Sequence, residues 1–72
     1  MYVKVKYYKG ELEGYHGREY VYRTSLPLKP GDQVIAPTAK EARQRGLVTG
    51  TVTEIPAFAC KEITEYWMAD ND

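Results

Sequence analysis

The amino-acid sequence predicts an all-β protein, a small five-stranded open barrel of SH3-like or similar form. Two observations support this class. Short stretches of alternating apolar and polar residues, rich in valine, tyrosine and threonine, recur along the chain. Glycine and proline separate them, as in the Pro30-Gly31 turn. We expect strands near residues 2–8, 18–24, 32–37, 46–55 and 61–66.

The first strand has the alternation of a half-buried strand. Within residues 2–8, Val3, Val5 and Tyr7 share the face that we expect to be buried, and lysines occupy the other face. Residues 9–17 follow with three glycines and predict a mobile loop.

The second strand, residues 18–24, is dense in β-forming side chains. Its pattern leaves open whether Tyr20 and Tyr22 or Val21 faces the core. We favour the tyrosines, because charged residues flank Val21 on its own face.

The third and fourth strands are separated by residues 38–45, which are good helix formers and predict a single helical turn or a flexible loop. In residues 46–55, alternation places the valines inward and the threonines outward. Gly50 at the centre of this strand predicts a bulge or a bend.

The C-terminal region allows two interpretations. Residues 61–66 can form a fifth strand that closes the barrel, or Ile63, Tyr66 and Trp67 can share one face of a short helix. The strand is favoured. We therefore expect one domain over residues 1–68, followed by an acidic tail at 69–72 that frays.

The charges of the chain cancel globally but not locally. Ten basic and ten acidic residues give a net charge of zero, yet residues 15–50 carry +3 and residues 51–72 carry −4. Overall electrostatics therefore do not favour a nucleic-acid partner, whereas a local basic patch remains open.

The single cysteine, Cys60, cannot form an intrachain disulfide, so a reducing cytoplasm is the expected compartment. No apolar run has the length of a signal peptide or a membrane span, so no membrane partner is expected.

Catalytic and metal-binding patterns are weak in this sequence. His16, the one histidine, lies in the glycine-rich stretch and is best interpreted as a solvated loop residue. His16 and Cys60 alone do not make a tetrahedral zinc site. We expect no enzyme activity, no cofactor, no metal and no small-molecule substrate.

The strongest candidate site is a basic loop with Lys40, Arg43 and Arg45, which Arg18 and Arg23 on the second strand could extend. Exposed tyrosines beside such cations would offer stacking faces to unpaired bases. The alternative is a charged, solvent-facing loop, since an acidic residue interrupts the cluster.

One known family shares part of this pattern. The segments YVY at 20–22, LPLKPGDQVIAP at 26–37 and GLVTGTVTEI at 46–55 resemble the N-terminal domain of the primosomal replication helicase. In that family this domain is a small barrel that binds DNA ends. The pattern is also similar to short bacterial and prophage proteins. The resemblance implies a barrel and a nucleic-acid partner, and it assigns no site residue.

Two function classes therefore stay open. One is a nucleic-acid-binding accessory module that uses the five basic residues and exposed tyrosines. The other is a protein-interaction or assembly domain that uses a tyrosine-rich surface or an edge strand. Convergence of the basic residues and exposed aromatics on one face would favour the first class.

Overall fold

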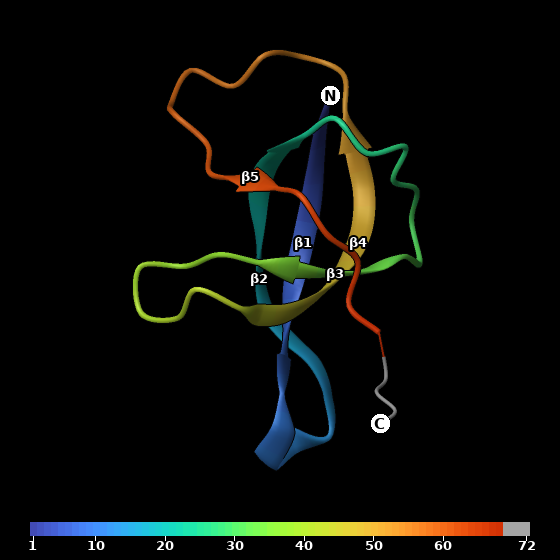
Figure 1. The fold of residues 1–72 in the computed structure, drawn as a ribbon, viewed down its shortest axis with the longest axis vertical. Coiled ribbons are helices and arrows are strands. Elements are labelled where there is room, and N and C mark those ends of the chain that lie inside the picture. Colours follow the sequence, from blue (N-terminus) through green and yellow to red (C-terminus); the bar gives the residue numbers. More distant parts are fainter. Residues whose placement is uncertain (69–72) are drawn as a thin grey trace.

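The computed structural model describes residues 1–68 and has a single five-stranded sheet with strand order β3-β4-β1-β2-β5 (Figure 1). The all-β prediction is confirmed. The expected fraying of residues 69–72 lies outside the described residues. The elements are β1 (Tyr2–Lys9), the 3-10 turn η1 (Gly10–Leu12), β2 (Gly14–Thr24), β3 (Gln33–Ala36), β4 (Gln44–Val52) and β5 (Glu62–Ile63).

The sheet curls into a nearly closed barrel because the segment after β5 reaches back to β3. The backbone N–H of Ile35 donates to Glu65 O at 3.1 Å, and that of Trp67 donates to Gln33 O at 3.0 Å. Tyr66 completes this contact as an isolated bridge to β3. A strand in this region is confirmed, although β5 is shorter than residues 61–66 and runs parallel to β2. The helical alternative is wrong.

The core consists of the side chains that alternation predicted to be buried. Val3, Val5, Val34 and Val48 are fully buried, and Ile63 joins them. Val52 is only half-buried, as is Thr49, whereas Thr51 and Thr53 are exposed as expected. The predicted register therefore holds in β1 and in β4 as far as Val48. Beyond it the faces of β4 are reversed, since Thr51 pairs with the buried Val3 and Val52 pairs with Tyr2.

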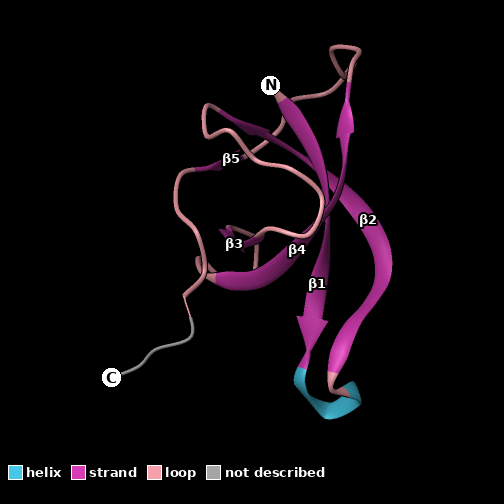
Figure 2. Ribbon diagram, turned by 90° about the vertical axis from the view of Figure 1, so that its right-hand side faces the viewer, coloured by secondary structure: helices cyan, strands magenta, loops and turns pink. Residues whose placement is uncertain are grey.

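The β1–β2 hairpin is longer than predicted and projects from the barrel (Figure 2). Residues 9–17 are not a loop, since they form η1 and the first part of β2. The ladder pairs Val5 with Tyr20 but Tyr7 with His16, so β2 carries two extra residues between these pairs. Gly17 lies in this bulge with φ of +93°, a conformation that suits glycine.

A second bulge lies in β4, next to the predicted position. Lys4 pairs with Gly50 and Val5 pairs with Val48, which leaves Thr49 as the extra residue. The predicted bulge is therefore confirmed within one residue. Gly50 itself has room for a side chain, because an added Cβ would approach nothing closer than Lys4 Cε at 3.6 Å.

The basic loop between β3 and β4 has no helical turn. Thr38 Oγ1 accepts a hydrogen bond from the Glu41 backbone N–H at 2.8 Å, which makes a tight turn. β4 then begins at Gln44, two residues before the predicted start. Gly46 lies inside the strand and is buried, since a Cβ there would lie 2.5 Å from Val5 Cγ1.

Candidate ligand-binding groove

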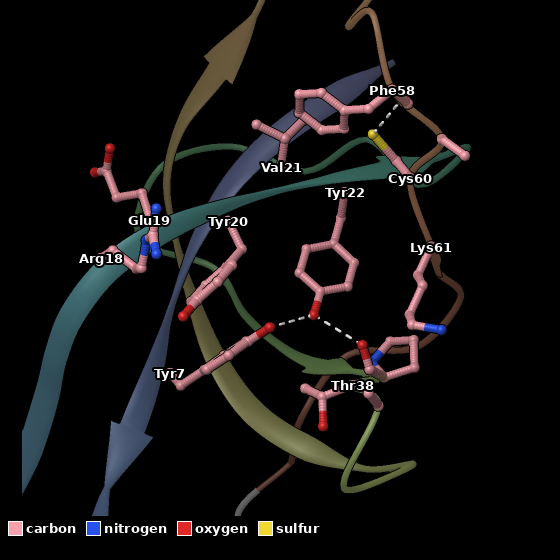
Figure 3. Close-up of a pocket in the computed structure, with 13 residues that line it drawn as sticks. Tyr7, Arg18, Glu19, Tyr20, Val21, Tyr22, Thr38, Phe58, Cys60 and Lys61 are labelled. Atoms are coloured by element: carbon pink, nitrogen blue, oxygen red, sulfur yellow. Dashed lines mark hydrogen bonds between the residues drawn. The ribbon is translucent and has the colours of Figure 1, made fainter.

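The outer edge of β2 faces two loops across a groove made of two adjoining hollows, one of which is drawn in Figure 3. Their volumes are about 390 and 410 Å³. Both hollows are lined by Tyr7, Tyr20, Thr38 and Ala39. The loop after β3 forms one wall, and residues 58–61 form another. We call this surface the tyrosine groove.

Aromatic rings form much of its surface. The rings of Tyr7 and Tyr20 stack with centroids 4.6 Å apart and planes 10° from parallel. Tyr20 is 38% exposed and Phe58 is 64% exposed, so both present ring surface to solvent. The Arg18 guanidinium lies 5.8 Å from the Tyr20 ring centroid, within range of a cation–π interaction. Tyr20 and Tyr22 pair with the buried Val5 and Val3, so both lie on the inner face of β2 as predicted, although only Tyr22 is buried.

A hydrogen-bonded chain crosses the floor of the groove (Figure 3). The hydroxyl oxygens of Tyr7 and Tyr22 lie 2.6 Å apart, and the Tyr22 hydroxyl donates to Pro37 O at 2.8 Å. Burial raises the pKa of Tyr22 above its ordinary value of 10.0, and the bond to Tyr7 raises it further. Tyr22 therefore stays neutral, and its two hydrogen bonds hold the loop after β3 against β2.

The groove has an excess of positive charge, although the net charge of the whole protein is zero. Four cationic side chains and two carboxylates line it: Lys9, Arg18, Lys40, Lys61, Glu19 and Glu41. Glu19 already has partners outside the groove, an ion pair with Lys4 at 3.8 Å and a hydrogen bond from Thr49 Oγ1 at 2.7 Å. The net local potential is therefore positive.

The structure brings two of the five predicted site residues, Arg18 and Lys40, to the groove. Among residues 1–68, neither takes part in an ion pair. Arg23 instead pairs with Glu62 at 3.4 Å, and Arg43 pairs with Glu65. Neither Arg23 nor Arg43 lines the groove, so the five residues do not converge on one face.

Arg45 belongs to a separate cluster. Its guanidinium lies 3.7 Å from the ring centroid of Trp67 and 4.2 Å from that of Tyr8. It also donates to Gln33 Oε1 at 3.0 Å and to the Tyr15 hydroxyl at 3.0 Å. The Tyr15 hydroxyl in turn donates to Gln33 Oε1. Arg45 therefore links the segment after β5 to β1, β2 and β3. Its guanidinium already interacts with aromatic rings and hydrogen-bond acceptors of the protein itself.

Sequence reasoning missed Tyr7, Phe58 and Lys61 as members of the site. Tyr7 was expected in the core and Lys61 at the start of the fifth strand, whereas residues 57–60 carried no recognised pattern. Phe58 between two alanines, shortly after Pro56, was the available signal, because a lone aromatic in a short loop outside the strand pattern can serve as a contact surface.

Cys60 and His16, the other two residues singled out in the sequence, do not form a site together. Cys60 is half-buried and reduced at the groove wall, and His16 is exposed on β2. Within residues 1–68, no group of three or more histidine, cysteine or acidic side chains is arranged to hold a metal ion. The described part of the chain also contains no helix with the length and hydropathy needed to cross a membrane.

No protein-family model matches this chain, and comparison with curated proteins and with solved structures gives no significant match either. Functional inference therefore depends on the groove itself.

Proposed function

We propose that this protein is a non-enzymatic binding module that holds single-stranded nucleic acid in the tyrosine groove. Unpaired bases stack on Tyr20 and Phe58, and Arg18 and Lys40 contact phosphates. The observation that carries this proposal is the half-exposed Tyr7–Tyr20 stack, beside which Arg18 and Lys40 form no ion pair with any of residues 1–68. Aromatic platforms inside a positive groove are the usual means of binding single strands, because every base has a face that stacks.

The resemblance to the N-terminal domain of the primosomal helicase supports the same ligand class. That resemblance, and an SH3-like barrel, remain part of the proposal. So does a cytoplasmic location, which fits a chain whose single cysteine is free.

A protein partner is the second candidate, and the outer edge of β2 favours it. The Arg23 N–H points outward and donates to Lys61 O, whereas the Thr24 N–H points to Met1 O. Because hydrogen-bonding directions alternate along a strand, the backbone of Val21 also points outward, into the groove. An extended peptide could pair with this edge.

Salt-dependent binding of a fluorescent twelve-nucleotide single strand tests the nucleic-acid proposal. Removing two phosphate contacts through Arg18→Gln with Lys40→Gln should flatten the slope of log K against log salt by about 1.4. The matched control is Arg43→Gln, which removes an exposed cation outside the groove. It should leave the slope unchanged.

The opposite result distinguishes the two candidates. Binding that is absent at low salt, or that weakens equally in the Arg43→Gln variant, would contradict the proposal. Binding of an extended peptide that depends little on salt would then favour the β2 edge.

A further inference from the structure

The hydrogen-bonded chain on the groove floor has a fixed direction. Pro37 O is a carbonyl oxygen and can only accept, so the Tyr22 hydroxyl must donate to it. A phenol has one proton. Tyr22 therefore has none left for Tyr7, and in the 2.6 Å contact between the two hydroxyls Tyr7 is the donor.

Because its proton is used in this bond, Tyr7 Oη can only accept hydrogen bonds from a group in the groove. Its proton points to Tyr22, and Tyr22 is its only hydrogen-bond partner among residues 1–68. Tyr7 lines both hollows, so a ligand that occupies either one lies beside Tyr7 and can approach its oxygen. Such a ligand must bring an N–H or O–H donor to this position. A group that only accepts, such as a carbonyl or an ionised phosphate oxygen, is repelled there.

We propose that Tyr7 Oη accepts a hydrogen bond from the exocyclic amino group of a base seated in the groove, so that amino-bearing bases are preferred. The inference rests on the proposed function. In this arrangement the cationic side chains contact phosphates, and Tyr7 contacts the edge of a base. Adenine, cytosine and guanine each carry such an amino group, whereas phosphate oxygens carry no proton at neutral pH.

The test compares two DNA strands that differ by one donor per base. Twelve-nucleotide oligodeoxyadenylate is matched with a strand in which unsubstituted purine replaces every adenine. The rings remain similar in size, so stacking is nearly preserved while the amino group is lost. Because a neutral hydrogen bond contributes about 0.5–1.5 kcal/mol, the adenine strand should bind roughly two- to twelvefold more tightly.

Tyr7→Phe removes the acceptor and retains the ring. In this variant the two strands should bind with about equal affinity. The control Tyr66→Phe changes an exposed tyrosine outside the groove and should bind the adenine strand more tightly by the same factor as the wild type. The wild-type ratio is informative even if Tyr7→Phe folds poorly.

Failure of the inference is distinguishable from failure of the proposed function. Equal wild-type binding of the two strands that is lost in Tyr20→Ala would overturn the role of Tyr7 and retain the groove as the binding site. A preference that survives in Tyr7→Phe would also overturn it. Absence of binding to both strands would overturn the proposed function and the inference together.

Discussion

The ring of Tyr20 stacks on the ring of Tyr7 across a diagonal of the β1–β2 ladder, next to a bulge in β2. Tyr20 pairs with Val5, so in a regular ladder Arg18 would lie opposite Tyr7. The bulge instead pairs His16 with Tyr7 and leaves Arg18 close to the Tyr20 ring. The two tyrosines form a diagonal aromatic pair at the barrel edge, and the bulge leaves a cation beside it.

The two glycines of β4 should respond differently to alanine. Gly46→Ala places a Cβ 2.5 Å from Val5 Cγ1, a stiff β-branched side chain in the core, and should cost about 1–3 kcal/mol or more. Gly50→Ala meets only ordinary contact at 3.6 Å and should change stability by less than about 0.5 kcal/mol. Denaturant unfolding measures both. A larger loss for Gly50→Ala than for Gly46→Ala would contradict the register of β4 on β1.

Stability should fall in alkaline solution through Tyr22. Its folded-state pKa lies above the ordinary value of 10.0, so the unfolded chain loses this proton first. The contribution of Tyr22 is complete below about pH 10, and it decreases by about 1.4 kcal/mol per pH unit above that value.

Tyr22→Phe isolates this effect. The variant loses the bond to Pro37 O and should be less stable by about 1–3 kcal/mol at neutral pH, because that carbonyl and the Tyr7 hydroxyl lose a partner. Its stability should then depend less steeply on pH above 10 than that of the wild type. Urea unfolding between pH 9 and pH 11 measures this dependence. If the free energy of unfolding fell equally steeply with pH in the variant and the wild type, Tyr22 would ionise as readily in the folded protein as in the unfolded chain.

Arg45 should act on the fold and not on the ligand. Arg45→Lys loses the planar contact with Trp67 and the paired bonds to Gln33, at a cost of about 1–2 kcal/mol. Trp67 is the only tryptophan, so its fluorescence emission should move to longer wavelength as the ring becomes solvated. The charge-removing variant Arg45→Gln should leave the salt slope of DNA binding unchanged. A flatter slope would instead support the basic loop as a phosphate contact.

The barrel could be predicted from sequence because its signals are local. The period of two in residues 2–8 places Val3 and Val5 on one face, and the glycine at position 50 marks a bulge within one residue. The bulge around Gly17 was not predicted, because its glycines and charges resemble those of a mobile loop.

The site could be predicted only in part because it depends on contacts between distant segments. Arg43 and Arg45 follow Lys40 closely in sequence, but the fold separates them: Arg43 and Arg45 meet different partners, whereas Lys40 lines the groove. The acidic partner of Arg43 and the aromatic partner of Arg45 both lie in the segment after β5, more than 20 residues away. Charge clustering along the chain was therefore a poor guide to charge clustering in space.

The most direct test of the account is an amide chemical-shift map of the protein titrated with a short single-stranded DNA at low salt. The tyrosine groove predicts that the largest shifts fall in three segments that are distant in sequence, residues 18–22, 38–40 and 58–61, and that they disappear in Tyr20→Ala. Shifts centred on Arg23, Arg43 or Arg45, or no shifts with excess oligonucleotide, would contradict it.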